Sequence, residues 1–124
     1  MGQSMSDVSQ FNRSLPGRVL REEERELIRS LLSRVYKPED LENALAKSRV
    51  TDMQDGGMGS LRFVGSEPRS FGKALAEAQY VDSDGVLISI ALNADNKGQL
   101  FELDFWKVDF SPLIRYPKPS DLLL

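Results

Sequence analysis

Apolar residues recur with two different periods along the chain, and the period changes after Ser48. Before that point they fall three and four residues apart, and after it they fall two apart. A spacing of three and four places side chains on one face of an α-helix, whereas a spacing of two places them on one face of a β-strand. The pattern therefore predicts helices first and strands afterwards.

Two helices are expected before the period changes. One apolar face is formed by Leu20, Leu27, Ile28, Leu31, Leu32 and Val35. The opposite face carries a run of Arg and Glu residues over 21–29, which we interpret as a solvated surface. The segment KPEDLENALAKS predicts a second helix, because Pro38 suits a first turn and the acids after it complement the helix dipole.

Five segments with strand periodicity follow, namely RVTDM, SLRFVG, FGKALAEAQYVD, VLISIALN and QLFELDFWKVDF. The DSDG turn between the third and fourth favours a hairpin. Alternate side chains of the last segment face opposite ways, with Phe101, Leu103 and Phe105 on one side and Glu102, Asp104 and Trp106 on the other. The order predicts an α+β fold, in which two N-terminal helices pack on one face of an antiparallel meander sheet of about four to five strands.

The length of 124 residues predicts one domain. Residues 1–17 show no periodicity and are expected to form a flexible N-terminal arm, which leaves 18–124 as the single α+β domain. A net charge of −3 and a pI near 5.0 argue against nucleic-acid binding, which needs a basic face. No membrane partner is expected, because the apolar stretches are far shorter than the roughly 20 residues of a membrane span.

The sequence contains no cysteine and no histidine. Disulfides, thiolate nucleophiles, zinc sites of the usual kind and histidine-based acid–base catalysis are therefore excluded. A chain without cysteine fits a reducing cytoplasm, which is the expected location. We predict no cofactor and no metal.

The glycine-rich stretch DMQDGGMGSL is the first candidate for chemistry. A phosphate-binding loop needs Lys and Ser or Thr after its last glycine, but here a strand follows. We therefore interpret the stretch as a hairpin in which Gly56, Gly57 and Gly59 allow positive φ angles. Asp55 and Met58 at its tip are candidates for partner contact, although Met58 could instead fill a gap in the core. Two further turn glycines are predicted, Gly85 and Gly98.

The segment NADNKGQLFELD imitates a calcium-binding loop. Lys97 stands where a ligand oxygen belongs, and Asp104 occupies the position of the usual glutamate. The flanking segments are strands rather than helices. No metal site is predicted there.

The segment FELDFWKVDF is the third candidate. Glu102 and Asp104 lie on one face of a strand, roughly 7 Å apart between Cα atoms. Such a pair could perform acid–base chemistry or bind a cation, although acids on a strand's solvent face are the ordinary case. Trp106 on the same face is typical of a protein-contact anchor, and the alternative is a ring covered by the C-terminal segment.

The motifs DGGMGSLRF, DSDGV, FELDFWKVDFSPL and the final YP together resemble an uncharacterised bacterial family of small single-domain proteins. The resemblance runs from about Leu20 to Pro117 and implies no catalytic residues. Trp106, Lys107 and Asp109 belong to its motifs, as do the three glycines of the hairpin. The size and acidity of the chain are also similar to those of bacterial immunity proteins that neutralise toxins.

Three functional hypotheses remain. The first is a non-enzymatic protein-binding module that uses Glu102, Asp104, Trp106, Asp55 and Met58. The second is a small-ligand-binding protein or hydrolase with a carboxylate cluster of Glu102, Asp104 and Glu77, joined by Lys107, in a pocket between sheet and helices. This second hypothesis predicts a carboxylate with a raised pKa in a concave site. The third is a structural subunit that forms a homo-oligomer through its leucine tail or an open sheet edge.

Overall fold

The computed structural model describes residues 16–123. All but two residues of the expected N-terminal arm lie outside this range. The elements are β1 (Arg18–Val19), α2 (Glu22–Leu32), α3 (Pro38–Lys47), β2 (Arg49–Asp52), β3 (Leu61–Phe63), β4 (Phe71–Val81), β5 (Leu87–Asp95), β6 (Leu100–Lys107) and a 3-10 turn, η1 (Pro119–Asp121).

One antiparallel sheet of six strands runs in the order β1-β2-β3-β6-β5-β4. The predicted α+β class is confirmed, and the strand number is slightly larger than the four to five expected. The order differs from a simple meander, because β6 returns between β3 and β5. Leu61 pairs with Leu103 at that junction, so the β2–β3 hairpin and the β4–β5–β6 meander share one sheet.

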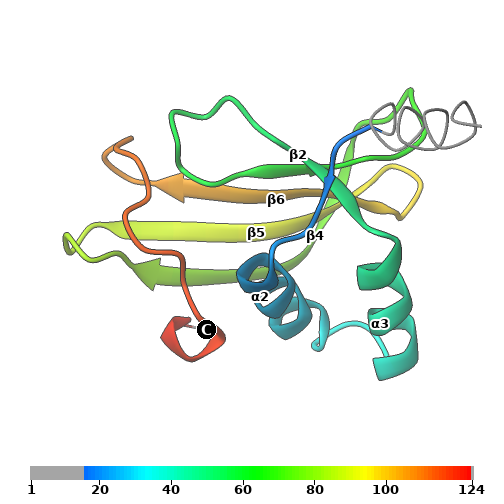
Figure 1. Cartoon of the computed structure of the whole chain (residues 1–124), viewed down its shortest axis with the longest axis horizontal. Coiled ribbons are helices and arrows are strands. Elements are labelled where there is room, and N and C mark those ends of the chain that lie inside the picture. Colours follow the sequence, from blue (N-terminus) through cyan, green and yellow to red (C-terminus); the bar gives the residue numbers. More distant parts are fainter. Residues whose placement is uncertain (1–15, 124) are drawn as a thin grey trace, which may run out of the picture.

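The helices and the C-terminal segment cover one face of this sheet (Figure 1). The apolar stripe of α2 is fully buried at Leu27, Ile28, Leu31 and Leu32. The strands contribute alternate side chains to the same core, among them Tyr80, Ile88, Ile90, Leu92, Leu103 and Phe105. The strand periodicity thus separates a buried face from the opposite face, which we call the open face.

Glu24 departs from the expectation that the charged run of α2 is a solvated surface. Its side chain is buried and accepts two hydrogen bonds of 2.9 Å from the guanidinium of Arg18, as well as one of 2.8 Å from the backbone N–H of Arg21. Burial alone would raise the pKa of Glu24, but the bonds from Arg18 and Arg21 outweigh it and lower that pKa. The prediction was wrong at this residue, which ties the start of α2 to β1.

None of the helices within residues 16–123 is long and apolar enough to cross a membrane. The last described residues return to the sheet, where the backbone N–H and C=O of Leu123 both bond to Gln79 at the edge of β4. Leu123 therefore docks on the sheet edge, and Leu122 packs against the core beside it in sequence.

Candidate functional site

The strand register aligns polar side chains in rows across the open face. Glu77 on β4 lies opposite Ala91 on β5, which lies opposite Asp104 on β6. The next row joins Gln79, Ser89 and Trp106 in the same way. Neighbouring strands are about 4.8 Å apart, so the Cα atoms of Glu77 and Asp104 are separated by about 10 Å.

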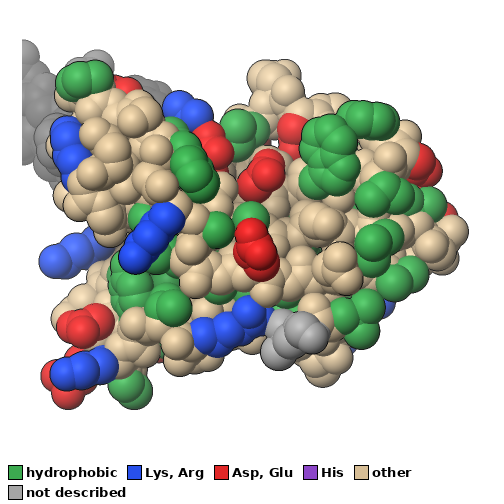
Figure 2. All heavy atoms as spheres, turned by 180° about the vertical axis from the view of Figure 1, so that it is seen from behind, with side chains coloured by type: hydrophobic (Ala, Val, Ile, Leu, Met, Phe, Trp, Pro, Cys, Tyr) green, Lys and Arg blue, Asp and Glu red, His purple; other side chains and the backbone are tan. Residues whose placement is uncertain are grey.

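Small side chains on the central strand of these rows hollow the open face. Ala91 and Ser89 form the floor, and longer side chains on β4 and β6 stand on either side of it. The resulting acidic depression has a volume of about 400 Å³ and reaches Leu123 beyond the edge of β4. Figure 2 shows this face, with acidic side chains near its middle and apolar side chains gathered toward one side.

Asp104 is the half-buried acid of the depression. Its carboxylate approaches the hydroxyl of Ser60 at 3.4 Å. Burial raises the pKa of Asp104, and the neighbouring charges of Glu102 and Asp55 raise it further against the weak hydrogen bond from Ser60. A carboxylate in this setting is stabilised by any cation that approaches it.

Glu102 lies on the same face as Asp104, as the strand periodicity predicted. Unlike Asp104, it has a cationic partner in the part of the chain that the structure describes. Its carboxylate forms an ion pair with Arg62, the residue opposite it on β3. The guanidinium of Arg62 also lies 4.6 Å from the ring centre of Phe101. Glu102 therefore lies one row along β6 from Asp104, outside the lining of the depression, as one half of a neutralised pair.

Trp106 lies at the end of the depression with 47% of its surface exposed. The C-terminal segment leaves the ring exposed, because that segment crosses the other face of the sheet. The ring of Phe110, itself 63% exposed, meets the indole edge-to-face with 4.9 Å between ring centres. Two large aromatic side chains thus pack together on the surface.

Phe110 adopts a positive φ of 65°, unlike every other non-glycine residue of the described chain. The backbone N–H of Phe110 donates a hydrogen bond of 2.9 Å to the carbonyl of Lys107, which closes the turn. The carboxylate of Asp109 stabilises the same turn, because it accepts hydrogen bonds from the backbone N–H and the hydroxyl of Ser111. A left-handed conformation costs a bulky residue about 1–2 kcal/mol. The fold therefore holds an exposed phenyl ring in a strained position.

An apolar end adjoins the aromatic pair. Val81, Leu87 and Val108 follow the two polar rows at the strand ends, and the exposed fractions of Val81 and Val108 are 46% and 49%. The open face therefore changes from acidic to apolar along the strands.

The glycine hairpin forms as expected, but Asp55 and Met58 at its tip serve the fold rather than partner contact. β2 and β3 do pair as a hairpin, and Gly56, Gly57, Gly59, Gly85 and Gly98 all have positive φ, as predicted. Met58, however, is buried, and its sulfur accepts a hydrogen bond from the N–H of Lys107 at 3.3 Å. The carboxylate of Asp55 closes the loop by binding the N–H groups of Met58 and Ser60. The assignment of Met58 to a contact surface was wrong, because its side chain fills the core instead.

Lys107 also lies away from the depression. It is fully buried on the helix-covered side, where its ammonium lies 2.8 Å from both Asp82 and Asp84 and 3.0 Å from the carbonyl of Pro112. A pocket between sheet and helices that joins Lys107 to Glu102 and Asp104 is therefore contradicted by the structure. The three acceptors around Lys107 satisfy the three N–H donors of its ammonium group.

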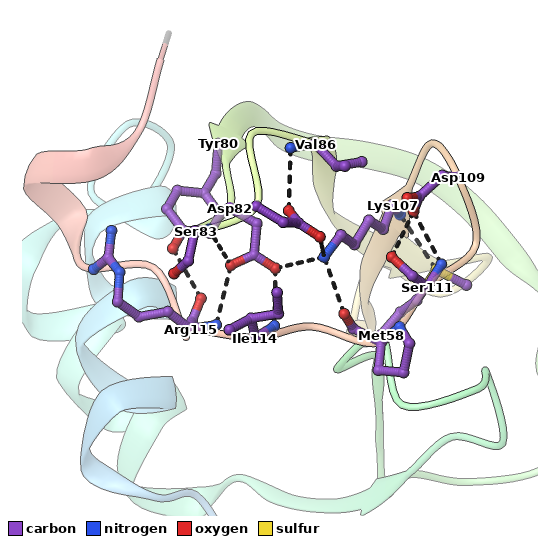
Figure 3. A network of polar contacts seen from close by, with 12 residues as sticks. Met58, Tyr80, Asp82, Ser83, Val86, Lys107, Asp109, Ser111, Ile114 and Arg115 are labelled. Carbon is purple, nitrogen blue, oxygen red and sulfur yellow. Dashed lines mark hydrogen bonds and ion pairs between the residues drawn. The ribbon is translucent and has the colours of Figure 1, made fainter.

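Asp82 is the centre of this buried network (Figure 3). It accepts bonds from Lys107 and from the backbone N–H groups of Ser83, Ile114 and Arg115. Burial alone would raise its pKa, but these bonds lower the pKa of Asp82 to about 2. The network fastens the C-terminal segment to the β4–β5 turn, and the DSDG and FWK motifs meet in it.

Within residues 16–123, no group of three or more Asp or Glu side chains is arranged to hold a metal ion. Asp95, in the segment that imitates a calcium loop, is paired with Arg69 at 3.0 Å and accepts the N–H groups of Lys97 and Gln99. Its carboxylate thus stabilises the β5–β6 turn.

Fold and site together define an α+β protein with one antiparallel sheet, covered on one face and hollowed on the other by an acidic and aromatic depression. Residues 17–117 match the family model described as Domain of unknown function (DUF6984), and the chain belongs to this family. The match includes the whole range, from about Leu20 to Pro117, over which the sequence resembles a family of small proteins. Comparison with curated proteins and with solved structures gave no match.

Proposed function

We propose that this protein is a non-enzymatic protein-binding module and that its contact surface is the open face around the acidic depression. The observation that carries the proposal is the Trp106–Phe110 pair. Two exposed aromatic rings pack edge-to-face at 4.9 Å, and one of them is held there at a positive φ.

The Trp106–Phe110 pair contributes little to the stability of the isolated protein. Exposed rings gain little from burial, and the strain at Phe110 reduces stability, so glycine would suit that position better. Strain of this kind persists at binding and catalytic sites, where the side chain serves a ligand. Tryptophan is also enriched among the residues that dominate protein interfaces.

The surroundings support an interface of mixed character. Apolar Val81, Leu87 and Val108 lie on one side of the aromatic pair, and the acidic depression lies on the other. Contiguous apolar patches rimmed by polar residues mark interaction sites on soluble proteins. Asp104 and Trp106 therefore stay in the proposed site with Glu102 at its border, whereas Met58 and the loop-closing Asp55 leave it.

We place this binding in the bacterial cytoplasm, which is supported by the sequence motifs and by the absence of cysteine. A toxin-neutralising role is one form of such binding. The acidity of the chain and of its open face is compatible with that role, which stays a prediction.

The proposal is tested by affinity capture from a lysate of the source organism at low and moderate salt. We expect a stoichiometric protein partner with the wild-type chain and with Glu39→Gln on α3, and loss of that partner with Trp106→Ala. Retention of the partner by Trp106→Ala, or its loss with Glu39→Gln, would contradict the assignment of the surface. The salt series separates specific binding from general attraction to an acidic protein.

A small-ligand site is the second candidate, because the raised pKa of Asp104 in a concave site is what that hypothesis predicts. Asp104 and Glu77 would then face the ligand from opposite sides of the depression. A thermal-shift screen against metabolites tests this candidate. Stabilisation that disappears with Asp104→Asn, in a chain that captures no protein, would favour it over the binding module.

A further inference from the structure

On the basis of the proposed binding function, we infer that the partner places a lysine or arginine side chain between Glu77 and Asp104, with adjoining apolar residues on Trp106 and Phe110. This placement follows from the charge, the shape and the edges of the open face.

The charges of the depression lack internal compensation. Across residues 16–123, acids with ion pairs include Asp52, Asp82, Asp95, Glu102 and Asp121. No ion pair within this range involves Glu77 or Asp104. Arg34 approaches from outside the edge of β4, but it donates to the backbone carbonyl of Glu77 at 2.8 Å rather than to the carboxylate.

The shape of the depression suits a long cationic side chain. The floor at Ala91 and Ser89 is low, and the two acids stand on opposite sides of it, one strand away in each direction. A guanidinium or ammonium group between them can bond to both carboxylates, and the indole of Trp106 lies beside the same space. Such a cation gains from charge-assisted hydrogen bonds and from contact with the aromatic face.

The raised pKa of Asp104 is consistent with this geometry. Burial and the like charges of Glu102 and Asp55 both disfavour its ionised form. A cation that enters the depression reverses these effects, so binding lowers the pKa of Asp104.

Other occupants fit less well. An added strand at the β4 edge meets Leu123, which already bonds to both backbone groups of Gln79. A second copy that packs its open face on the first about a two-fold axis brings like carboxylates together. Nucleic acid is repelled by the same charges.

The experiment pans a displayed library of random twelve-residue peptides against the full chain. Four proteins are compared: wild type, Trp106→Ala, the double variant Glu77→Gln with Asp104→Asn, and the double variant Glu26→Gln with Glu39→Gln. The last is a matched control, since it removes two negative charges from exposed positions on α2 and α3. Thermal unfolding of each protein is recorded first, and Glu77→Gln alone replaces the double variant if that variant unfolds, because Glu77 is exposed.

We expect wild type and the control to enrich peptides with Lys or Arg next to apolar residues. Trp106→Ala should enrich none of them, and Glu77→Gln with Asp104→Asn should lose the basic residues from the enriched set. Trp106 is the single tryptophan of the sequence, so its fluorescence reports binding of a selected peptide directly. Replacing the peptide's arginine by neutral citrulline should raise its Kd about tenfold or more, as should the loss of both carboxylates.

Two results would overturn the inference, and they differ in what they leave standing. Enrichment that depends on Trp106 but selects neutral or acidic peptides refutes the cationic partner and leaves the binding module intact. Absence of any enrichment that depends on Trp106 contradicts the proposed function itself, and the inference with it.

Discussion

Trp106 and Lys107 are neighbours in the chain but lie on opposite faces of β6, one 47% exposed and the other fully buried. The alternation of a strand divides the FELDFWKVDFSPL motif into two sets of residues. One set, with Lys107 and Pro112, fastens the C-terminal segment to the sheet, whereas the other, with Asp104 and Trp106, forms the open face. Mutations in one motif should therefore have two distinct phenotypes.

Trp106→Ala should weaken partner binding by on the order of 2 kcal/mol, because an interfacial tryptophan carries a large share of binding energy. The free energy of unfolding should change by less than about 1 kcal/mol, since the ring is half exposed. Urea unfolding and a binding titration measure the two quantities. Loss of folding in place of binding would assign Trp106 to the structural core.

Phe110→Gly should leave stability unchanged or raise it by up to about 1 kcal/mol, because glycine adopts a φ of 65° without steric strain. Binding should weaken at the same time, since the edge-to-face partner of Trp106 is removed. Chemical denaturation and the same titration give both values. A large loss of stability would show that the phenyl ring supports the fold.

Asp82→Asn should lower the free energy of unfolding by about 3 kcal/mol, because it removes one partner of a buried ion pair. The amides of Ile114 and Arg115 should then exchange hydrogen faster, since both donate to Asp82. Asp84→Asn is the control, because Asp84 is more exposed and holds only one of the three bonds of Lys107. Equal effects of the two substitutions would contradict the central position of Asp82.

The pH dependence of Asp82 follows from its lowered pKa. The unfolded chain binds a proton near the ordinary value of 3.8, whereas the folded protein binds it only near 2. The unfolded state therefore holds more protons in this window, and stability falls as the pH falls through it. The advantage of wild type over Asp82→Asn should be full above about pH 4 and should shrink toward pH 2 in unfolding measured across that range.

The contribution of Asp104 to stability should depend on pH in the opposite direction to that of Asp82. Its pKa is raised by burial and by neighbouring acids, so the folded protein holds the proton more strongly than the unfolded chain. Ionised Asp104 reduces stability at neutral pH, and Asp104→Asn should be more stable than wild type there but not in acid. Thermal unfolding at neutral and acidic pH checks this, and a variant that is less stable at neutral pH would contradict it.

Local pattern sufficed for much of the fold. The three-and-four spacing around Leu27 and Leu31 predicted α2, and alternation around Ile88 and Ile90 predicted β5. The strand β1 has two residues, which is too short for a period to show. The place of β6 between β3 and β5 depends on the pairing of Leu61 with Leu103, which no local signal encodes.

The candidate site could be predicted from the sequence only in part, for similar reasons. Alternation placed Glu102, Asp104 and Trp106 on one face, and the structure agrees. The row from Glu77 through Ala91 to Asp104 requires the register of three strands, and the Asp82–Lys107 pair joins residues 25 positions apart. A positive φ at Phe110 could not be predicted, because glycine is the residue that signals such a backbone.

The most direct test of the central claim maps the bound surface by amide chemical shifts. The ¹⁵N-labelled protein is titrated with its captured partner or a selected peptide. We expect the largest changes at Ser89, Ala91, Asp104, Trp106 and Phe110, with little change along α2 and α3. Changes concentrated on the helices, with a silent open face, would contradict it.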